Sequence, residues 1–355
     1  MPKVRLSGTV LGPEDPSRSA RARLLFHLFN AGWDIYNSNG DQQITLANIE
    51  EKIIESDAFV FTPGASLQDL FKAISVFVGY QTLDKNLANK PTVILNDDGS
   101  WDPLFRLLEH LHDRGTVRQN YRDYLLIVDS PSGVVKALEE FRDKGLPPID
   151  REAIEDHPQL PADAKTPPPT DLQGRVCVFC SATIEKEGYL ADGEELGRQL
   201  AEHKLGCVSG AGKSGVMGAV VRGSVAAGGW TAGSNVPHII RLEGLPEGLS
   251  YFWLRDDIYT RMEVMIENSE AFVIFPGGSG TVQELLALMI FLEQGDAMMK
   301  GKPVVIFNRR DQDGIAFWDP LIKLLENYCC QEQFTVVDDL HAIVPTIEEK
   351  LARQE

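Results

Sequence analysis

Residues 276–284, Pro-Gly-Gly-Ser-Gly-Thr-Val-Gln-Glu, combine a glycine-rich turn with an acidic side chain. They follow the apolar run Ala271–Phe275 and open an amphipathic stretch, which predicts a buried strand, a turn and a helix. Glycines let a backbone approach a ligand closely, and the free N–H groups of a helix N-terminus attract anions. Glu284 lies one turn into that helix, where a carboxylate could stabilise developing positive charge. The segment therefore predicts phosphate binding combined with catalysis.

The same residues also have a purely structural interpretation. The pattern Thr281-x-x-Glu284 fits a capping box, in which the threonine caps the helix and the glutamate reaches back to its first residue. A capping box would explain both side chains without a ligand. It does not explain Gly277, Gly278 and Gly280, because glycine costs conformational entropy and is most useful where a backbone must approach a ligand.

A second glycine-rich segment, residues 210–218, reads Gly-Ala-Gly-Lys-Ser-Gly-Val-Met-Gly. It follows the predicted strand Cys207–Ser209 and precedes the predicted helix Val216–Ala227. It is not a Walker A loop, because the upstream Gly-x-x-x-x spacing is missing. It is not a clean dinucleotide fingerprint either, because it follows the second strand of its half instead of the first. Two interpretations stay open, phosphate or ribose binding and a plain tight turn.

Composition narrows the class of ligand. The net charge of −18 argues against nucleic acid as a partner, because affinity for nucleic acid comes mainly from Lys and Arg at phosphates. A small anion can still be held locally by backbone N–H groups. The start of the chain has no apolar core of signal-peptide length, and no apolar run approaches 18 residues. We therefore expect a cytoplasmic protein without a membrane partner.

The five cysteines do not indicate a metal site. Cys177 and Cys180 have CxxC spacing, but they lie in the apolar run Val176–Cys180, which predicts a buried strand. No second pair with suitable spacing completes a zinc site. We expect buried, reduced thiols and no metal ligands.

The chain contains two copies of one pattern. Residues 146–172 are rich in Pro, Asp and Ala and predict a linker between a first half, 1–145, and a second half, 173–355. Three segments recur in the same order at separations of 212 to 217 residues, which indicates a tandem duplication. The recurring pairs are Ser56–Ser66 with Ser269–Ser279, Lys90–Asn96 with Lys302–Asn308, and Trp101–Leu104 with Trp318–Leu321.

Each half alternates short apolar runs with longer amphipathic segments. This alternation predicts an α/β fold: two tandem Rossmann-like domains, each a doubly wound parallel sheet, with the first one degenerate. In the second half we predict strands at Val176–Cys180, Cys207–Ser209, Ala271–Phe275 and Pro303–Phe307, and helices at Gly188–His203, Val216–Ala227 and Thr281–Glu293. Ligands bind beyond the carboxyl ends of such strands, and both glycine-rich segments fall there.

The second half resembles the LOG family of cytokinin riboside 5′-monophosphate phosphoribohydrolases, long labelled "lysine decarboxylases". The signature Pro-Gly-Gly-x-Gly-Thr-x-x-Glu and an upstream arginine carry the resemblance, which covers about residues 175–325. The matching segments are Val178–Ser181, Gly210–Gly218, Arg261–Met265, Ser269–Glu284 and Lys302–Val304. The resemblance implies hydrolysis of the N-glycosidic bond of a nucleoside 5′-monophosphate, giving free base and ribose 5-phosphate without a cofactor.

The resemblance also implies the roles of individual residues. The essential pair of the family maps to Arg261 and Glu284, with the helix start at Gly280 and Thr281 taking the 5′-phosphate. For Arg261 the structural alternative is an ion pair at the surface of an acidic helix. The full set expected to bind substrate or phosphate is Ser181, Gly210, Gly212, Lys213, Gly215, Met217, Gly277, Gly278, Ser279, Gly280 and Thr281.

The sequence departs from the family pattern at two of these places. Ala211 replaces the middle glycine of the usual Gly-Gly-Gly, and Met262 replaces the lysine of the usual Arg-Lys pair. The segment Ser234–His238 is unlike the plant type, and several motifs look closer to bacterial nucleotide 5′-monophosphate nucleosidases. The preferred base, whether purine, pyrimidine or cytokinin, therefore stays open.

The first half keeps the scaffold but not the signature. Pro63–Asp69 lacks the Gly-Thr pair, and Asn48 stands where the second half has Arg261. Asp69 places a carboxylate opposite Glu284, although Ser66-x-x-Asp69 is also a helix cap. We expect this half to be catalytically inactive and to serve as a dimerisation surface, a regulatory nucleotide site or both, in a homodimer or higher homo-oligomer. The rival interpretation of the whole chain is a nucleotide-binding sensor without turnover.

Overall fold

The structure is a computed structural model of the chain. It describes residues 2–7, 17–37, 46–84, 86–87, 90–117, 119–145, 164–311, 314–328 and 331–353. The chain divides into two compact units. The first contains Met1–Asp113 and Arg118–Asp150, and the second contains Arg114–Val117 and Arg151–Glu355.

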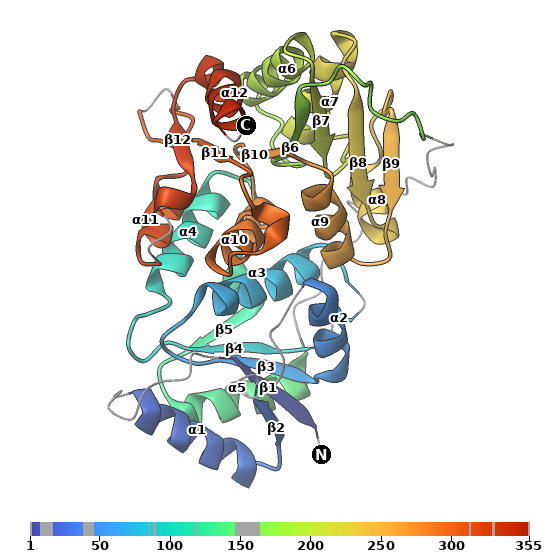
Figure 1. The fold of residues 1–355 in the computed structure, drawn as a ribbon. Coiled ribbons are helices and arrows are strands. Elements are labelled where there is room, and N and C mark those ends of the chain that lie inside the picture. Colours follow the sequence, from blue (N-terminus) through green and yellow to red (C-terminus); the bar gives the residue numbers. More distant parts are fainter. Residues whose placement is uncertain are drawn as a thin grey trace. The chain divides into compact units, whose positions relative to one another are not determined.

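The second unit is built on a seven-stranded parallel sheet (Figure 1). Its strands are β6 (Gly174–Phe179), β7 (Leu205–Ser209), β8 (Thr231–Asn235), β9 (Tyr251–Leu254), β10 (Ala271–Ile274), β11 (Val304–Phe307) and β12 (Thr335–Val337). They lie in the order β12-β11-β10-β6-β7-β8-β9, and every pair is parallel. The chain runs outward from β6 through β9 and then crosses to the other side of β6 at β10. The carboxyl ends of β6 and β10 therefore flank a topological switch point, where such sheets bind ligands.

Helices connect these strands. They are α6 (Glu187–Glu202), α7 (Gly215–Ala226), α8 (Pro237–Glu243), α9 (Ile258–Glu267), α10 (Ser279–Glu293), α11 (Asp319–Glu326) and α12 (Ile343–Ala352), with 3-10 turns η2 (Ala297–Met299), η3 (Gln331–Gln333) and η4 (Leu340–Ala342). Glycines bring α6 and α7 together, because a Cβ atom on Gly197 would lie 2.0 Å from the Val220 carbonyl oxygen. Figure 1 shows α6 and α7 beside β7.

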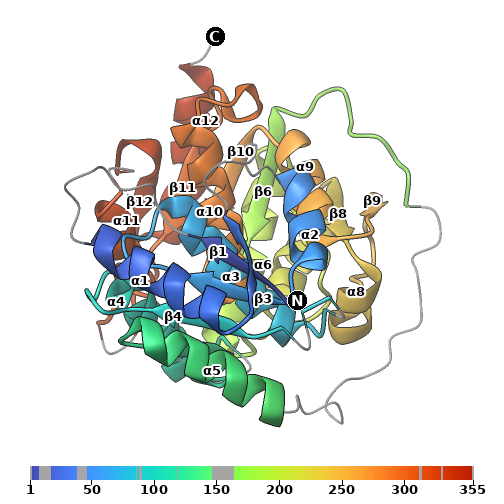
Figure 2. The same ribbon diagram turned by 90° about the horizontal axis from the view of Figure 1, so that it is seen from below.

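The first unit has a five-stranded parallel sheet of order β2-β1-β3-β4-β5. Its strands are β1 (Lys3–Ser7), β2 (Asp34–Asn37), β3 (Ala58–Phe61), β4 (Thr92–Leu95) and β5 (Leu125–Val128). Its helices are α1 (Ser17–Asn30), α2 (Leu46–Glu55), α3 (Leu67–Gln81), α4 (Asp102–Asp113), the 3-10 turn η1 (Tyr121–Asp123) and α5 (Pro131–Lys144). Figure 2 shows α1 and α5 side by side, and their apolar residues pack with β1, β3 and β4 in one core.

The predicted fold class is confirmed in both units, since every strand pairing in each sheet is parallel and helices connect the strands. The strands and helices predicted in the second half all form, with bounds within a few residues. The sequence did not reveal β8, because Thr231–Asn235 reads Thr-Ala-Gly-Ser-Asn and lacks the apolar, β-branched composition that marks a strand. The elements that follow, α8, β9 and α9, were not predicted either.

One matching contact supports the duplication. After β4, the side chain of Asn96 accepts from the Trp101 backbone N–H at 3.0 Å and donates to Asp102 at 2.8 Å. After β11, Asn308 makes the same two bonds, at 2.7 Å to Trp318 and 2.8 Å to Asp319. The connecting loop differs in length, because Trp101 follows Asn96 by five positions and Trp318 follows Asn308 by ten. The longer loop belongs to the second copy.

Several predictions fall wholly or partly outside the described residues. These are the first part of the linker, 146–163, the cysteines at 329 and 330, and the expectation that the first half has no counterpart of the Gly210–Gly218 loop, which concerns residues 38–45 after β2. Further along the linker, Lys165 forms an isolated antiparallel bridge with Tyr251 of β9. No helix among the described residues is long and apolar enough to span a membrane.

The three described cysteines are buried, as predicted from the sequence. Cys177, Cys180 and Cys207 are buried and free, and burial raises the pKa of each thiol, that of Cys207 to about 12. The prediction of buried, reduced thiols is confirmed for these three.

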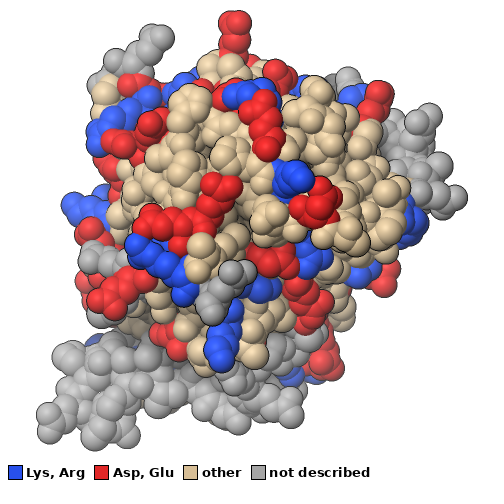
Figure 3. All heavy atoms as spheres, turned by 45° about the horizontal axis from the view of Figure 1, so that its top comes forward, with Lys and Arg blue, Asp and Glu red and all other residues tan. Residues whose placement is uncertain are grey.

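On the face drawn in Figure 3, basic and acidic side chains are interspersed and the basic ones do not gather into a patch.

Candidate active site

The catalytic pair expected from the sequence comes together in the second unit. Nη1 of Arg261, on α9, lies 4.0 Å from Oε1 of Glu284, on α10. Arg261 is 8% exposed and Glu284 is 5% exposed. The interpretation of Arg261 as part of a surface ion pair is therefore wrong. Burying a charged pair costs desolvation free energy. Stability alone therefore does not explain why this pair lies beyond the carboxyl ends of the strands.

The Glu284 carboxyl is strongly perturbed. Burial raises its pKa from 4.5 to about 7, the Arg261 guanidinium opposes this rise, and the Glu243 carboxylate adds to it. Burial dominates because removing a carboxylate from water favours its neutral form. A carboxyl with a pKa near 7 is about half ionised at neutral pH, which suits a catalytic group. Such a perturbation beside an arginine is typical of functional sites.

Local structure explains where Arg261 points. Asp257 caps α9, accepting from the backbone N–H groups of Tyr259 and Thr260 at 2.8 and 2.9 Å. The guanidinium one turn into α9 then donates to the carbonyl oxygens of Ser234 at 2.9 Å and Gly210 at 3.2 Å. These carbonyls lie at the carboxyl ends of β8 and β7. The two hydrogen bonds therefore hold the guanidinium at the carboxyl ends of these strands.

The capping interpretation of Thr281 and Glu284 is wrong. The N-cap of α10 is Gly278, no side chain caps the helix, and Thr281 is already its third residue. Glu284 therefore makes no capping contribution to the helix start. The burial of its carboxyl therefore has no explanation in helix formation.

The glycines of the same loop separate into two kinds. A Cβ atom on Gly277 would lie 2.1 Å from Oγ1 of Thr281, and one on Gly278 would lie 2.3 Å from the carbonyl oxygen of Thr116. Close packing within the unit thus accounts for both. A Cβ atom on Gly280 would meet nothing within 4 Å. Open space therefore adjoins Gly280 at the helix start, and packing does not account for this glycine.

The glycines of the Gly210–Gly218 loop are accounted for by the protein itself. A Cβ atom on Gly210 would lie 2.0 Å from the Arg261 guanidinium, and one on Gly212 would lie 2.9 Å from Glu243. Gly215 has a φ of +61° and lies against the backbone of Ala182. These glycines shape the loop around the Arg261 and Glu243 side chains, so they do not by themselves indicate phosphate.

Ala211 is the strained residue of this loop. Its φ is +55°, a left-handed conformation in which a Cβ atom is unfavourable. Its methyl group is buried with Ile240 and Phe252. The departure from the family glycine thus leaves the left-handed turn in place and adds a small apolar contact.

The remaining predicted residues lie around the switch point. The Ser181 backbone N–H donates to the Pro276 carbonyl at 3.2 Å, which ties the loop after β6 to the loop after β10. The Ser181 hydroxyl accepts from the backbone N–H groups of Thr183 and Ile184, so it stabilises its own loop. Met217 is buried and its sulfur accepts from the Gly212 N–H at 3.0 Å, whereas Lys213 is exposed.

Sequence reasoning missed Glu243. It ends α8, its backbone carbonyl accepts from the Lys213 N–H at 3.2 Å, and its charge raises the pKa of Glu284. Only the folding of the unpredicted α8 brings it to the site, so no local motif marks it. Among the described residues no group of three His, Cys, Asp or Glu side chains is arranged to hold a metal ion.

A family model described as "Possible lysine decarboxylase", the older label of the LOG family, matches residues 31–138 and 217–353. The chain belongs to the LOG family. The two matched stretches of this LOG-family chain fall in its two halves, as expected for a duplication.

Relatives match about half of this LOG-family chain. A "Probable cytokinin riboside 5′-monophosphate phosphoribohydrolase" of Arabidopsis thaliana is 31% identical over 184 residues, covering 51% of this chain and 87% of the relative. A "Cytokinin riboside 5′-monophosphate phosphoribohydrolase" of Rhodococcoides fascians is 30% identical over 156 residues, covering 43% of this chain and 74% of the relative. The structure of a molybdenum cofactor carrier protein of Chlamydomonas reinhardtii is 22% identical, with a TM-score of 0.39, over 50% of this chain and 98% of the other.

Proposed function

We propose that this chain is a phosphoribohydrolase that cleaves the N-glycosidic bond of a nucleoside 5′-monophosphate, releasing the free base and ribose 5-phosphate. The observation that carries the proposal is the buried pair of Arg261 and Glu284, 4.0 Å apart, with the pKa of Glu284 raised to about 7. Relatives at about 30% identity are named for this type of reaction.

The ionised form of Glu284 would act on the sugar. As the bond between C1′ and the base breaks, positive charge develops at C1′ and the ring oxygen. A carboxylate withdrawn from water can stabilise that charge or attack C1′. Water then supplies a hydroxyl group to C1′ and a proton to the departing base, which balances the hydrolysis. The carboxylate returns to its starting state.

Arg261 would orient the carboxylate and hold substrate oxygens. Its planar guanidinium is permanently charged, and the carbonyls of Ser234 and Gly210 already fix two of its donors. A positively charged neighbour also favours the ionised form of Glu284. Because a misplaced reacting group loses rate steeply, this fixed geometry supports a catalytic role for the pair.

The 5′-phosphate would bind at the start of α10. The helix is 15 residues long, and its first N–H groups have no acceptor within the helix. The space beside Gly280 lets an anion approach them. The proposal covers nucleoside 5′-monophosphates as a class, because Ala211 and Met262 depart from the family pattern and leave the base open.

The direct test is to incubate the purified chain with AMP, GMP, CMP, UMP and isopentenyladenosine monophosphate and to measure ribose 5-phosphate. Release from at least one nucleotide supports the proposal. Binding of a nucleotide with no release from any of the five would contradict it and favour the nucleotide-sensing alternative. The same assay on matched nucleosides, which lack the phosphate, checks the role of α10, since we expect them to be poor substrates.

A further inference from the structure

We infer that residues 114–117 position the phosphate-binding loop of the second unit, and that Arg114 is a positioning residue held by Asp311. We call Arg114–Val117 the strap. In the sequence it lies in the first half, directly after α4, but in the structure it groups with the second unit. The inference rests on the proposed function for its catalytic consequence, although the strap itself is defined by contacts.

The strap touches both loops that flank the switch point. The carbonyl oxygen of Thr116 lies so close to Gly278 that a Cβ atom there would be only 2.3 Å away. The same oxygen accepts from the hydroxyl of Thr183, in the loop after β6, at 3.4 Å. Thr116 and Val117 are 4% and 8% exposed, so the contact is buried.

Gly278 is the residue through which the strap would act. It is the N-cap of α10, and its carbonyl accepts the first helical hydrogen bond, from the Val282 N–H at 3.1 Å. Its position sets the direction of the N–H groups proposed to hold the phosphate. A strap that is displaced would therefore disturb the start of α10 without touching Glu284.

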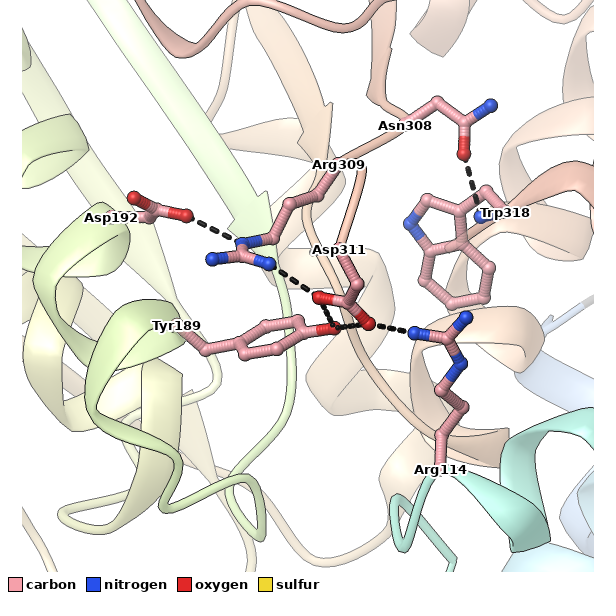
Figure 4. A network of polar contacts seen from close by, with 7 residues as sticks. All are labelled: Arg114, Tyr189, Asp192, Asn308, Arg309, Asp311 and Trp318. Atoms are coloured by element: carbon pink, nitrogen blue, oxygen red, sulfur yellow. Dashed lines mark hydrogen bonds and ion pairs between the residues drawn. The ribbon is translucent and has the colours of Figure 1, made fainter. Parts of the chain in front are cut away.

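A charged network holds the strap in place (Figure 4). Asp311 accepts from the Arg114 guanidinium, from the Tyr189 hydroxyl at 2.7 and 2.8 Å, and from Arg309. Arg309 in turn donates to Asp192 at 2.6 Å and lies 4.1 Å over the Tyr189 ring. The side chains of Arg114 and Asp311 are 12% and 20% exposed, so solvent screens their ion pair less than it screens a surface pair.

The loop that supplies Asp311 is the one that is longer in the second copy. Residues 309–317 separate Asn308 from Trp318, whereas only 97–100 separate Asn96 from Trp101. In the first copy, Ser100 from the short loop bonds directly to the Gly64 N–H of the equivalent turn, at 3.0 Å. In the second copy the longer loop holds Arg114 instead, and the strap contacts the turn. The longer loop of the second copy thus supplies the carboxylate that pairs with Arg114.

The test compares Arg114→Met with a matched control, Arg122→Met, in the full chain. Arg122 is eight residues along, pairs with Glu109 at the surface, and has a side chain that is 60% exposed. In Arg114→Met we expect the Val282 amide to exchange with solvent about tenfold faster. We also expect KM for the nucleotide and Kd for ribose 5-phosphate to rise roughly tenfold, with kcat changing less. Arg122→Met should leave all four quantities unchanged.

Further variants keep the test decisive if Arg114→Met unfolds. Asp311→Asn preserves shape and should act in the same direction, while Arg114→Lys should retain most of the wild-type behaviour. The double variant Arg114→Met/Asp311→Asn should be no worse than the more affected single variant, because both remove one interaction. Unchanged Val282 exchange in both Arg114→Met and Asp311→Asn, or an equal effect in Arg122→Met, would overturn the inference. Absent turnover in the wild type would contradict the proposed function alone, because amide exchange and ribose 5-phosphate binding would still test the strap.

Discussion

Residues 63–69 and 276–284 stand at the same place in two copies of one fold, after β3 and after β10, yet the helices that follow them begin differently. In the first copy, Ser66 caps α3, and Asp69 completes a capping box by accepting from the Ser66 N–H at 3.1 Å. In the second copy, Gly278 stands at the cap and no side chain caps α10. The acidic side chain of the first copy caps its helix, whereas that of the second copy takes no part in capping.

Asp69 and Glu284 do not occupy equivalent positions in their helices. Asp69 is the third residue of α3, whereas Glu284 is the sixth residue of α10, so the two acids lie a turn apart in their helices. The sixth residue of α3 is Lys72, which forms an ion pair with Asp69 at 3.8 Å. The expectation that Asp69 stands opposite Glu284 is therefore wrong, and its alternative, a helix cap, is confirmed. The side chain of Asn48, predicted opposite Arg261, lies outside the described residues.

The largest expected effect separates these two acids. Glu284→Gln should lower kcat by about a thousandfold or more, because the amide cannot carry the negative charge that stabilises the transition state. Asp69→Asn, the matched change in the first copy, should leave kcat unchanged and cost about 1 kcal/mol of stability through the weakened cap. Steady-state assays and thermal unfolding of both variants check this. Equal losses of activity would remove the distinction between the copies.

Glu284→Gln should raise the free energy of unfolding, whereas Asp69→Asn should lower it. Folding raises the pKa of this carboxyl from 4.5 to about 7, so the ionised group opposes folding above that range. The stability that its protonation gives is complete below pH 4.5 and is lost as the pH rises to about 7. Glu284→Gln should therefore stabilise the second unit by about 3 kcal/mol at pH 8 and by little at pH 5. Denaturant unfolding at the two pH values measures the difference, and a gain that does not depend on pH would contradict the assignment.

A third prediction concerns the second residue of each helix, Gly280 in α10 and Gln68 in α3. Gly280→Gln copies the first unit into the second. It should not lower stability, since open space surrounds Gly280 and glycine costs about 1 kcal/mol in a helix. It should raise KM for the nucleotide by about tenfold or more by filling the place proposed for the phosphate. An unchanged KM would show that the phosphate does not bind at the start of α10.

The smallest effect is expected at Ala211. Changing it to glycine relieves about 1 kcal/mol of left-handed strain but loses a buried methyl group worth about 0.8 kcal/mol. The two nearly cancel, so Ala211→Gly should be close to neutral in thermal unfolding. Ala219→Gly, within α7, loses both a buried methyl and helix propensity and should cost about 2 kcal/mol. Similar losses in both variants would show that the φ of Ala211 is not strained.

Local patterns were enough to predict the helix that carries Glu284, but they did not predict α9, which carries Arg261. The strand before Pro276 is uniformly apolar and the helix after it has a clear glycine start, so their order and the place of the turn beyond the carboxyl end of the strand followed from the sequence. The switch point did not, because it depends on the strand order of the sheet. The pairing of Arg261 with Glu284 came from the family resemblance, because no spacing rule places two residues of different helices within 4.0 Å. The sequence alone could not decide between a capping box and a reactive acid at Glu284.

Long-range contacts account for what the sequence did not reveal. Glu243 reaches the site only through α8, whose preceding strand β8 is short of apolar residues. The strap lies more than 160 residues before Gly278 in the sequence, and its contact is made by a backbone carbonyl, which every residue type has. Two of the three glycines expected to serve a ligand also pack too closely against Thr281 and Thr116 for a side chain to fit. Glycine patterns alone do not distinguish close packing from ligand binding.

The dependence of kcat/KM on pH tests most directly whether Glu284 is the reactive carboxylate. Measured on the wild-type chain between about pH 5 and 9, it reports the ionisation of essential groups in the free enzyme. We expect kcat/KM to rise with pH and level off above about 7, as Glu284 loses its proton, and we expect this rise to be absent from any residual activity of Glu284→Gln. A profile that is flat through this range, or one that falls through pH 7, would contradict the role given to the Glu284 carboxylate.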